Sequence, residues 1–168
     1  MKVKVVIPLD DGGRKKVDQY RFQFDRKLIK VFEPAIELIP PINYFDNIRN
    51  IINNFNNIMH GLKRFKVKID KIVTDIPEEN ALSFTIEEDK SINMLIHKLL
   101  RSNYFVENES QNFVPYILIY NNGDKNESES IYDSIVIDNF KHDFFVSQIL
   151  LIMQDKTKSW DIITECSL

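Results

Sequence analysis

The sequence is poor in the residues that mark disulfide-rich, metal-binding or strongly basic proteins. Its 168 residues include one cysteine, four glycines and three histidines, and the formal net charge is −3. The lone Cys166 excludes a disulfide framework within the chain and is typical of a reducing compartment. The slightly negative charge provides no general attraction for polyanions. These scarcities favour a cytoplasmic protein over a secreted one.

Long apolar runs and familiar catalytic motifs are missing too. The alternating run at residues 1–8 is too short for the hydrophobic part of a signal peptide, and no other run approaches the length of a membrane span. The sequence contains no glycine-rich phosphate loop, no zinc-ligand spacing and no Ser-His-Asp signature. We therefore predict no membrane association, no metal site and no cofactor.

The sequence does have enough apolar residues for one buried core. The chain has 168 residues, of which 43% are hydrophobic. This length and content suit a single domain over residues 1–168, and the chain is small for two independent domains. Helical spacing predicts helices over 14–29, 44–60, about 89–101 and, in short form, 127–134. Alternation and short apolar runs predict strands over 2–8, 34–39, 64–69, 82–86, 113–120, 144–153 and 159–166. This order predicts an α+β fold with mainly antiparallel pairing.

Several connections are also predicted. The segment 10–13 is rich in Asp and Gly and predicts a turn, and the polar segment 121–130 predicts a mobile loop. The last two strands are expected to form a hairpin with a loop over 154–158. The basic residues of the helix at 14–29 are expected on a solvated face: Arg14, Lys15, Lys16, Arg21, Arg26 and Lys27.

Two of the predicted strands begin with a proline and occupy matching places in the chain. Pro34 precedes the run AIELI, and Pro115 precedes the run YILIY. The second run is almost wholly apolar and ends at turn residues 121–123, which is typical of a buried strand near the middle of a sheet. The repetition predicts a pseudo-symmetric protein of two lobes, each with one of these strands at its centre, and a groove between the lobes.

This pair of strands resembles the signatures of the 2H phosphoesterase superfamily, the 2′-5′ RNA ligase-like group, which read Pro-His-x-Thr/Ser. The similarity extends over nearly the whole chain, including the strand at 65–69 after the second helix and the final hairpin at 145–168. The resemblance implies a two-lobed α+β fold with antiparallel sheets, helices on the outside and a central groove.

The resemblance also assigns positions to the site. Ala35 and Tyr116 stand where active members have their two histidines, and Glu37 and Leu118 stand where they have a hydroxyl residue. In active members the histidines exchange protons with the attacking hydroxyl and the leaving oxygen. Alanine has no such proton, and tyrosine, with a pKa near ~10, is a poor base at neutral pH. We therefore predict no catalytic residues and an inactive phosphoesterase.

The first functional hypothesis is a binding protein for a nucleotide, a cyclic oligonucleotide or an RNA end. It is supported by the implied groove and by Tyr116 and Tyr120 on one strand face. The basic row Arg64, Lys66 and Lys68 would supply the rim of such a site, although a solvated sheet face explains that row equally well.

The second hypothesis is a protein-interaction or structural module in which the groove is filled. Ala35 and Leu118 resemble core residues. An ionised carboxylate at Glu37 would repel a phosphate and would suit ribose hydroxyls, a base amine or an internal Arg or Lys partner. Because a buried carboxylate needs a partner, we predict that the Tyr116 hydroxyl donates to Glu37 across the groove. Enzymatic action on an unrecognised substrate ranks third. The histidines His60, His97 and His142 lie outside both signature strands and are expected at the surface.

Overall fold

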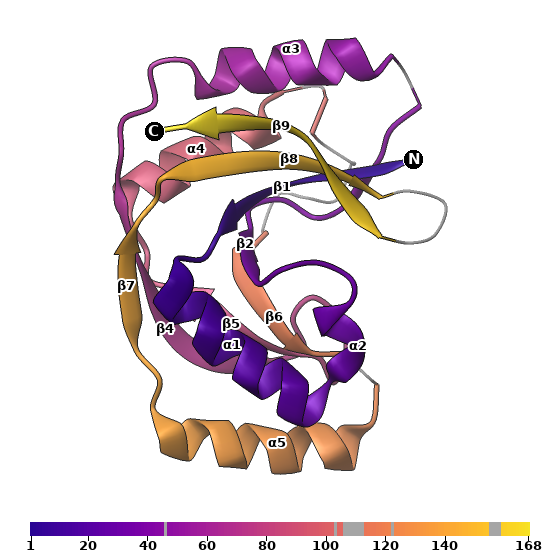
Figure 1. The fold of residues 1–168 in the computed structure, drawn as a ribbon, viewed down its shortest axis with the longest axis vertical. Helices are drawn as coiled ribbons and strands as arrows, with labels where there is room; N and C mark the ends of the chain where they lie inside the picture. The colour runs from indigo at the N-terminus through magenta and orange to yellow at the C-terminus, as the bar shows by residue number, and fades with distance from the viewer. Residues whose placement is uncertain (46, 103, 106–112, 122, 155–158) are drawn as a thin grey trace.

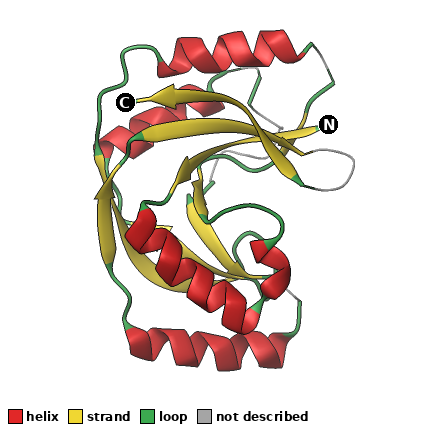
Figure 2. Cartoon of the chain, viewed as in Figure 1, coloured by secondary structure: helices red, strands yellow, loops and turns green. Residues whose placement is uncertain are grey.

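A curled antiparallel sheet of nine strands forms the centre of the protein, with helices packed around it (Figures 1 and 2). The computed structural model describes residues 1–168 apart from 46, 103, 106–112, 122 and 155–158. The strands are β1 (Lys2–Pro8), β2 (Ala35–Glu37), β3 (Ile42–Asn43), β4 (Lys66–Thr74), β5 (Leu82–Ile86), β6 (Tyr116–Tyr120), β7 (His142–Phe145), β8 (Gln148–Gln154) and β9 (Trp160–Ser167). The helices are α1 (Asp11–Phe24), α2 (Arg26–Ile29), α3 (Ile48–Met59), α4 (Lys90–Leu100) and α5 (Lys125–Asp138).

The sheet consists of two halves of similar topology, one formed by β2, β1, β8 and β9 and the other by β6, β5, β4 and β7. Its strand order is β7-β4-β5-β6-β2-β1-β8-β9, with β3 beside β1. In one half α1 connects β1 to β2, and in the other α4 connects β5 to β6. Helix α1 packs against β6, which belongs to the opposite half, and α3 packs against β9 and α4. Figure 1 shows this packing of α1 against the opposite half, with α1 and α5 beside β4 to β6. The predicted two-lobed, pseudo-symmetric α+β fold is confirmed.

The two proline-led strands meet at the junction between the halves. Strands β2 and β6 share a single residue pair, Glu37 with Tyr116. Each strand is therefore the inner edge of its own half, and the prediction that each is central in its lobe is wrong. The reason is that β2 has only three residues, bounded by Pro34 and Pro40, and proline has no N–H for a ladder.

The two faces of the sheet carry separate apolar clusters. The main core lies between the sheet and the helices and includes the fully buried Phe55, Phe84, Phe105 and Tyr120. A smaller buried cluster consists of Val6, Ala35, Leu150 and Ile152. Because side chains alternate along a strand, Val6 points away from the main core that its neighbours Val5 and Ile7 enter. The inner, concave face of the sheet thus has an apolar patch of its own.

The predicted helix over 14–29 is two helices in the structure. The Asp10 side chain accepts from the Gly13 N–H and starts α1 within the predicted turn. Asp25 then separates α1 from α2, and its side chain accepts from the Lys27 N–H and the Asn121 N–H. The break places α2 at an angle to α1 beside the junction of β2 and β6 (Figure 1).

Other departures have similar local causes. The predicted mobile loop at 121–130 largely belongs to α5, because Asp124 caps that helix and Ile131 and Ile135 are buried on one face. The predicted strand at 144–153 is divided into β7 and β8, since β7 pairs with β4 in one half and β8 with β1 in the other. The predicted hairpin of the last two strands is present, but residues 155–158 of its loop lie outside the described residues. No helix in the described part of the chain is long and apolar enough to cross a membrane.

Candidate functional site

A small cavity of about 50 Å³ opens at the junction of β2 and β6. Three of the four signature positions line it, namely Ala35, Glu37 and Leu118. The other lining residues are Lys4 and Val6 from β1, Arg21 from α1, Leu28 from α2, and Val31, Phe32 and Glu33 from the loop before β2. The fourth signature residue, Tyr116, is buried next to Glu37 and reaches the site through its hydroxyl group. The signature positions therefore converge as the resemblance implied.

Glu37 is held between two partners. The Lys4 Nζ atom lies 2.6 Å from its Oε1 atom, and the Tyr116 hydroxyl donates to its Oε2 atom over 2.9 Å. The predicted hydrogen bond from Tyr116 to Glu37 is confirmed. Lys4 reaches the same carboxylate because Val6 pairs with Glu37 and Lys4 stands two residues earlier on the same strand face. The buried carboxylate is thus neutralised within the protein.

This arrangement removes Tyr116 as a base. Its burial, and next the negative charge of Glu37 and the hydrogen bond to it, raise the pKa of the Tyr116 hydroxyl well above its usual value. A phenol that keeps its proton can donate a hydrogen bond but cannot accept a proton from an attacking hydroxyl. At neutral pH, Tyr116 therefore serves only as a donor to Glu37.

Arg21 occupies the place where the ladder between β2 and β6 ends. Continuing the register past the Glu37–Tyr116 pair would set Ala35 opposite Leu118. Instead the Arg21 Nε and Nη2 atoms donate to the Leu118 carbonyl over 3.0 and 2.8 Å, and Nη1 donates to the Phe32 carbonyl over 3.0 Å. The prediction that Arg21 lies on a solvated face is wrong, since only 5% of the residue is exposed.

The charge of Arg21 is poorly compensated. Burial lowers the pKa of its guanidinium to about 10, although nearby Asp18, Glu37 and Asp25 act in the opposite direction. Among the described residues no carboxylate forms an ion pair with it within 4.0 Å. The buried charges that line the cavity are Lys4, Arg21 and Glu37, because Glu33 is largely exposed and faces Arg14 at 3.5 Å. The buried side chains that line the cavity therefore carry two positive charges and one negative charge.

Tyr120 does not belong to this site. Alternation from Tyr116 predicts that Tyr120 faces the groove, but β6 pairs with β5 in a shifted register. Ser83 lies opposite Leu118, whereas Leu82 lies opposite Tyr120. This bulge turns Tyr120 into the main core, where its hydroxyl donates to Glu127 over 2.7 Å. The prediction of Tyr120 as a groove residue is therefore corrected.

The basic row on β4 lies at a distance from the cavity. Register and alternation give Lys66 and Lys68 the sheet face of Tyr116, with β5 between β4 and β6. Both lysines are exposed and form ion pairs, Lys66 with Asp143 and Lys68 with Glu87. Arg64 is exposed as well and lies over an aromatic ring of β7. None of the three lines the cavity.

Other reactive side chains are remote from the cavity or poorly suited to catalysis. His142 lies with its Nε2 atom 2.6 Å from Asp10 Oδ1, at the start of α1, and His60 and His97 are exposed. Burial raises the pKa of the Cys166 thiol, which disfavours the nucleophilic thiolate. Within the described residues, no three His, Cys, Asp or Glu side chains are grouped so that they could hold a metal ion.

Lys4 and Arg21 were the residues that the sequence did not reveal as parts of the site. Lys4 alternates with apolar residues, and this pattern places it on the polar face of the strand. The pattern does not show that this face is enclosed by other elements. Arg21 sits among five other basic residues of one predicted helix, so nothing in the pattern distinguishes it. Its distinguishing feature is tertiary, because α1 crosses to β6 and brings Arg21 to a free carbonyl there.

Comparison with known proteins identifies related sequences and folds. No family model matches the sequence. The chain is 24% identical to "Putative phosphoesterase OB1230" of Oceanobacillus iheyensis, with 80% of this chain and 84% of that protein aligned. It is also 24% identical to "Putative phosphoesterase BH1439" of Halalkalibacterium halodurans, with 86% of this chain and 84% of that protein aligned.

Solved structures share the fold at low sequence identity. TT0787 of Thermus thermophilus superposes with a TM-score of 0.71 at 11% identity, over 100% of this chain and 98% of that one. E. coli LigT in complex with 3′-AMP superposes with a TM-score of 0.64 at 12% identity, over 99% and 97%. The sequence relatives are named as putative phosphoesterases and the chain shares the fold of LigT, and both findings support the predicted resemblance to the 2H phosphoesterase superfamily and its 2′-5′ RNA ligase-like group.

Proposed function

We propose that this protein binds a nucleotide, a cyclic oligonucleotide or an RNA end through a phosphate group at the cavity between β2 and β6, and does not hydrolyse it. The observation that carries the proposal is the pair of buried cations that line the cavity beside the signature positions. Lys4 and Arg21 line the cavity, and Glu37 is the single buried carboxylate among the lining residues. Charge-assisted hydrogen bonds from such cations are the usual means of holding a phosphate.

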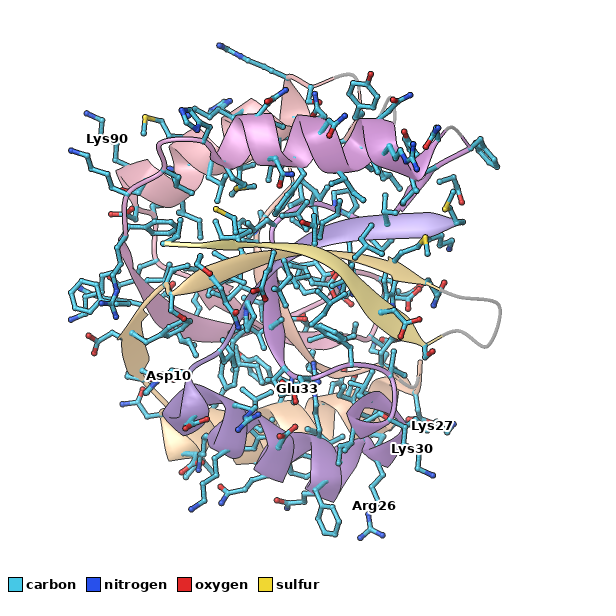
Figure 3. The ribbon with its side chains drawn as sticks, turned by 45° about the horizontal axis from the view of Figure 1, so that its top comes forward. Asp10, Arg26, Lys27, Lys30, Glu33 and Lys90 are labelled. Atoms are coloured by element: carbon cyan, nitrogen blue, oxygen red, sulfur yellow. The ribbon has the colours of Figure 1, made fainter. Side chains whose placement is uncertain are left out.

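The class of ligand is supported by the structures that share the fold. LigT is described in complexes with 3′-AMP, phosphate and ATP. Glu37 is not an obstacle to a phosphate here, because Lys4 and Tyr116 already engage both of its oxygens. Arg26 and Lys27 of α2 and Lys30, which follows it, extend outward into solvent (Figure 3), where further phosphates of a longer ligand would lie.

The residues at the site support the proposed absence of hydrolysis. Ala35 replaces one proton-transferring histidine of the family pattern, and Tyr116 replaces the other with a hydroxyl that keeps its proton. General acid–base catalysis needs groups that release and take up protons near the working pH. The side chains around the cavity can hold a phosphate but supply no such pair.

The size of the cavity restricts what enters it. A buried water needs roughly 10–15 Å³ of such volume. A cavity of about 50 Å³ therefore admits a few waters or one phosphate-sized group, and the nucleoside part must lie outside it. The ligand would bind with its phosphate toward Lys4 and Arg21 and with its base on the open face of the groove.

Calorimetric titration with inorganic phosphate and with 3′-AMP tests the proposal. The test variant is Lys4→Met with Glu37→Gln, which removes both members of the ion pair, so that neither Lys4 nor Glu37 is left as a buried charge without its partner. We expect the wild type to bind both probes and this variant to bind each at least about 10-fold more weakly, since a charged contact is lost. Lys68→Met is the matched control, because Lys68 is exposed and outside the cavity, and it should bind like the wild type.

A filled groove that serves as an interaction or structural module is the second candidate. It is favoured by the mutual neutralisation of Lys4, Glu37 and Tyr116 and by the small size of the cavity. The same titration separates the two functions. A folded wild type that gives no heat signal with phosphate or 3′-AMP would refute the first proposal and support the second.

A further inference from the structure

We propose that Trp160 and the apolar patch around it form a stacking platform for a nucleobase. This inference rests on the proposed function, because the base belongs to the ligand whose phosphate would occupy the cavity. We call the platform the groove patch. It consists of the buried Val6, Ala35, Leu150 and Ile152 and of Phe32 and Trp160, which are partly buried against them.

The groove patch lies on the same sheet face as the cavity. Strand β1 pairs Lys4 with Ile152 and Val6 with Leu150, and Val6 also pairs with Glu37 on its other side. Directly paired residues project to one face, so the patch and Glu37 share the concave face. This face is separate from the main core, and the apolar residues there are not needed to cover the helices.

The patch and the cavity are also continuous. Val6, Ala35 and Phe32 belong to both. The Lys4 ammonium joins them directly, because its Nζ atom lies 4.4 Å from the centroid of the Trp160 ring and 2.6 Å from Glu37 Oε1. A phosphate drawn toward Lys4 therefore stands next to the indole, within the span of one nucleotide.

The chemistry of the patch suits a flat aromatic group. The Lys4 ammonium lies over one face of the Trp160 ring and the indole retains exposed surface, so a base would stack on the other face, and any base would fit because every base has a π-face. Ile162 extends the surface, since it pairs with Ile152 and 56% of it is exposed. Charge complementarity at Lys4 and Arg21 determines which end of the ligand points into the cavity.

Trp160 makes a direct measurement possible, because it is the only tryptophan in the chain. Its fluorescence is followed during titration with 3′-AMP, and with inorganic phosphate and ribose 5-phosphate as probes that lack a base. We expect saturable quenching by 3′-AMP, with the dissociation constant found by calorimetry, and no quenching by the two other probes. Free tryptophan titrated in the same way corrects for light absorbed by the base.

Variants separate stacking from a structural role of the side chain. Trp160→Ala should weaken 3′-AMP binding about 5- to 150-fold, the range for one stacked base, and leave the affinity for inorganic phosphate unchanged. Trp160→Phe should recover most of the 3′-AMP affinity. Phe145→Ala is the control, because Phe145 is 55% exposed on β7, at the far end of the sheet, and it should bind like the wild type.

The outcomes distinguish this inference from the function on which it rests. If the wild type binds phosphate and 3′-AMP, but 3′-AMP neither quenches Trp160 nor responds to Trp160→Ala, the platform is refuted and the phosphate site stands. If the wild type binds neither probe, the proposed function fails first. Retained phosphate affinity shows that Trp160→Ala is folded; if that variant does not fold, the wild-type fluorescence titration and Trp160→Phe decide the question.

Discussion

The effect of Glu37 on phosphate binding depends on the side chains that surround it. In isolation, a carboxylate at a phosphate-binding position argues against phosphate binding. In the structure Glu37 is paired with Lys4 and hydrogen-bonded by Tyr116, and Arg21 adds a second buried cation nearby. The charge of the cavity is therefore set by the group and not by Glu37 alone.

Tyr116→Phe tests the strength of this network. It removes the donor to Glu37 and keeps the aromatic ring, so the free energy of unfolding should fall by about 1.5–3 kcal/mol, as for hydrogen bonds to charged groups. Urea unfolding at neutral pH gives this value. Tyr132→Phe, at a half-buried tyrosine of α5, is the control and should change stability little. Equal stability of Tyr116→Phe and the wild type would contradict the hydrogen bond.

At the scale of elements, α1 is the connector of the fold. It leaves β1 in one half, packs under β6 in the other, and delivers Arg21 to the junction between them. It also contacts α5. The Tyr20 hydroxyl donates to Asp138 Oδ2 over 2.5 Å, and Lys16 Nζ lies 2.5 Å from the same oxygen. The position of the Arg21 side chain thus depends on how α1 is tied down along its length.

The tie between α1 and α5 has a predictable pH dependence. Hydrogen bonds from Lys16 and then Tyr20 lower the pKa of the Asp138 carboxyl below its ordinary value. A carboxyl with a lower pKa in the folded state stabilises the protein above its unfolded pKa, and this contribution is lost as pH falls through the folded pKa. Asp138→Asn should therefore reduce stability at neutral pH.

Urea unfolding at a series of pH values measures this effect. The difference between Asp138→Asn and the wild type should stay constant from neutral pH down to about 5 and shrink below about 4. Asp133→Asn is the control, at an exposed position of the same helix. A difference that grows as the pH falls would show that the sign of the shift is wrong.

At the scale of the whole molecule, the site exists only where the two halves meet. Ala35 and Glu37 come from one half and Tyr116 and Leu118 from the other, and one ladder pair joins them. A catalytic pair of the family type would need one group from each half, facing across the junction. At this junction the chain has Ala35 and Tyr116 at the positions that the resemblance assigns to the two groups.

Activity measurements on rebuilt variants test this view. The wild type should not hydrolyse 2′,3′-cyclic AMP above the buffer rate. The fourfold variant Ala35→His, Glu37→Thr, Tyr116→His and Leu118→Thr should gain turnover. The variant with only the first two changes should be slower by about 10²- to 10⁴-fold, the usual contribution of one proton-transfer group.

Two outcomes would contradict this prediction. Wild-type turnover that disappears in Tyr116→Phe would show that Tyr116 is catalytic. A fourfold variant that folds, binds phosphate and still shows no turnover would refute the assignment of the four positions to the family signatures.

The sequence by itself determined the periodic elements, the two proline-led strands and the residues at the four signature positions. These follow from local rules, since alternation and helical spacing are properties of neighbouring residues. The hydrogen bond between Tyr116 and Glu37 is predicted from the family's arrangement of the two signature strands, together with the rule that a buried carboxylate requires a partner.

Only the tertiary structure decided which polar faces are enclosed. Alternation shows that Lys4 shares a strand face with Lys2 and Val6. Burial of that face also requires β8, β9 and helix α1, which packs against β6 of the other half. A shift of one residue between β5 and β6 sends Tyr120 into the core, because a bulge reverses every side chain beyond it. The buried cations at Lys4 and Arg21, on which the proposed phosphate site depends, arise from contacts between segments far apart in the chain, which local patterns do not encode.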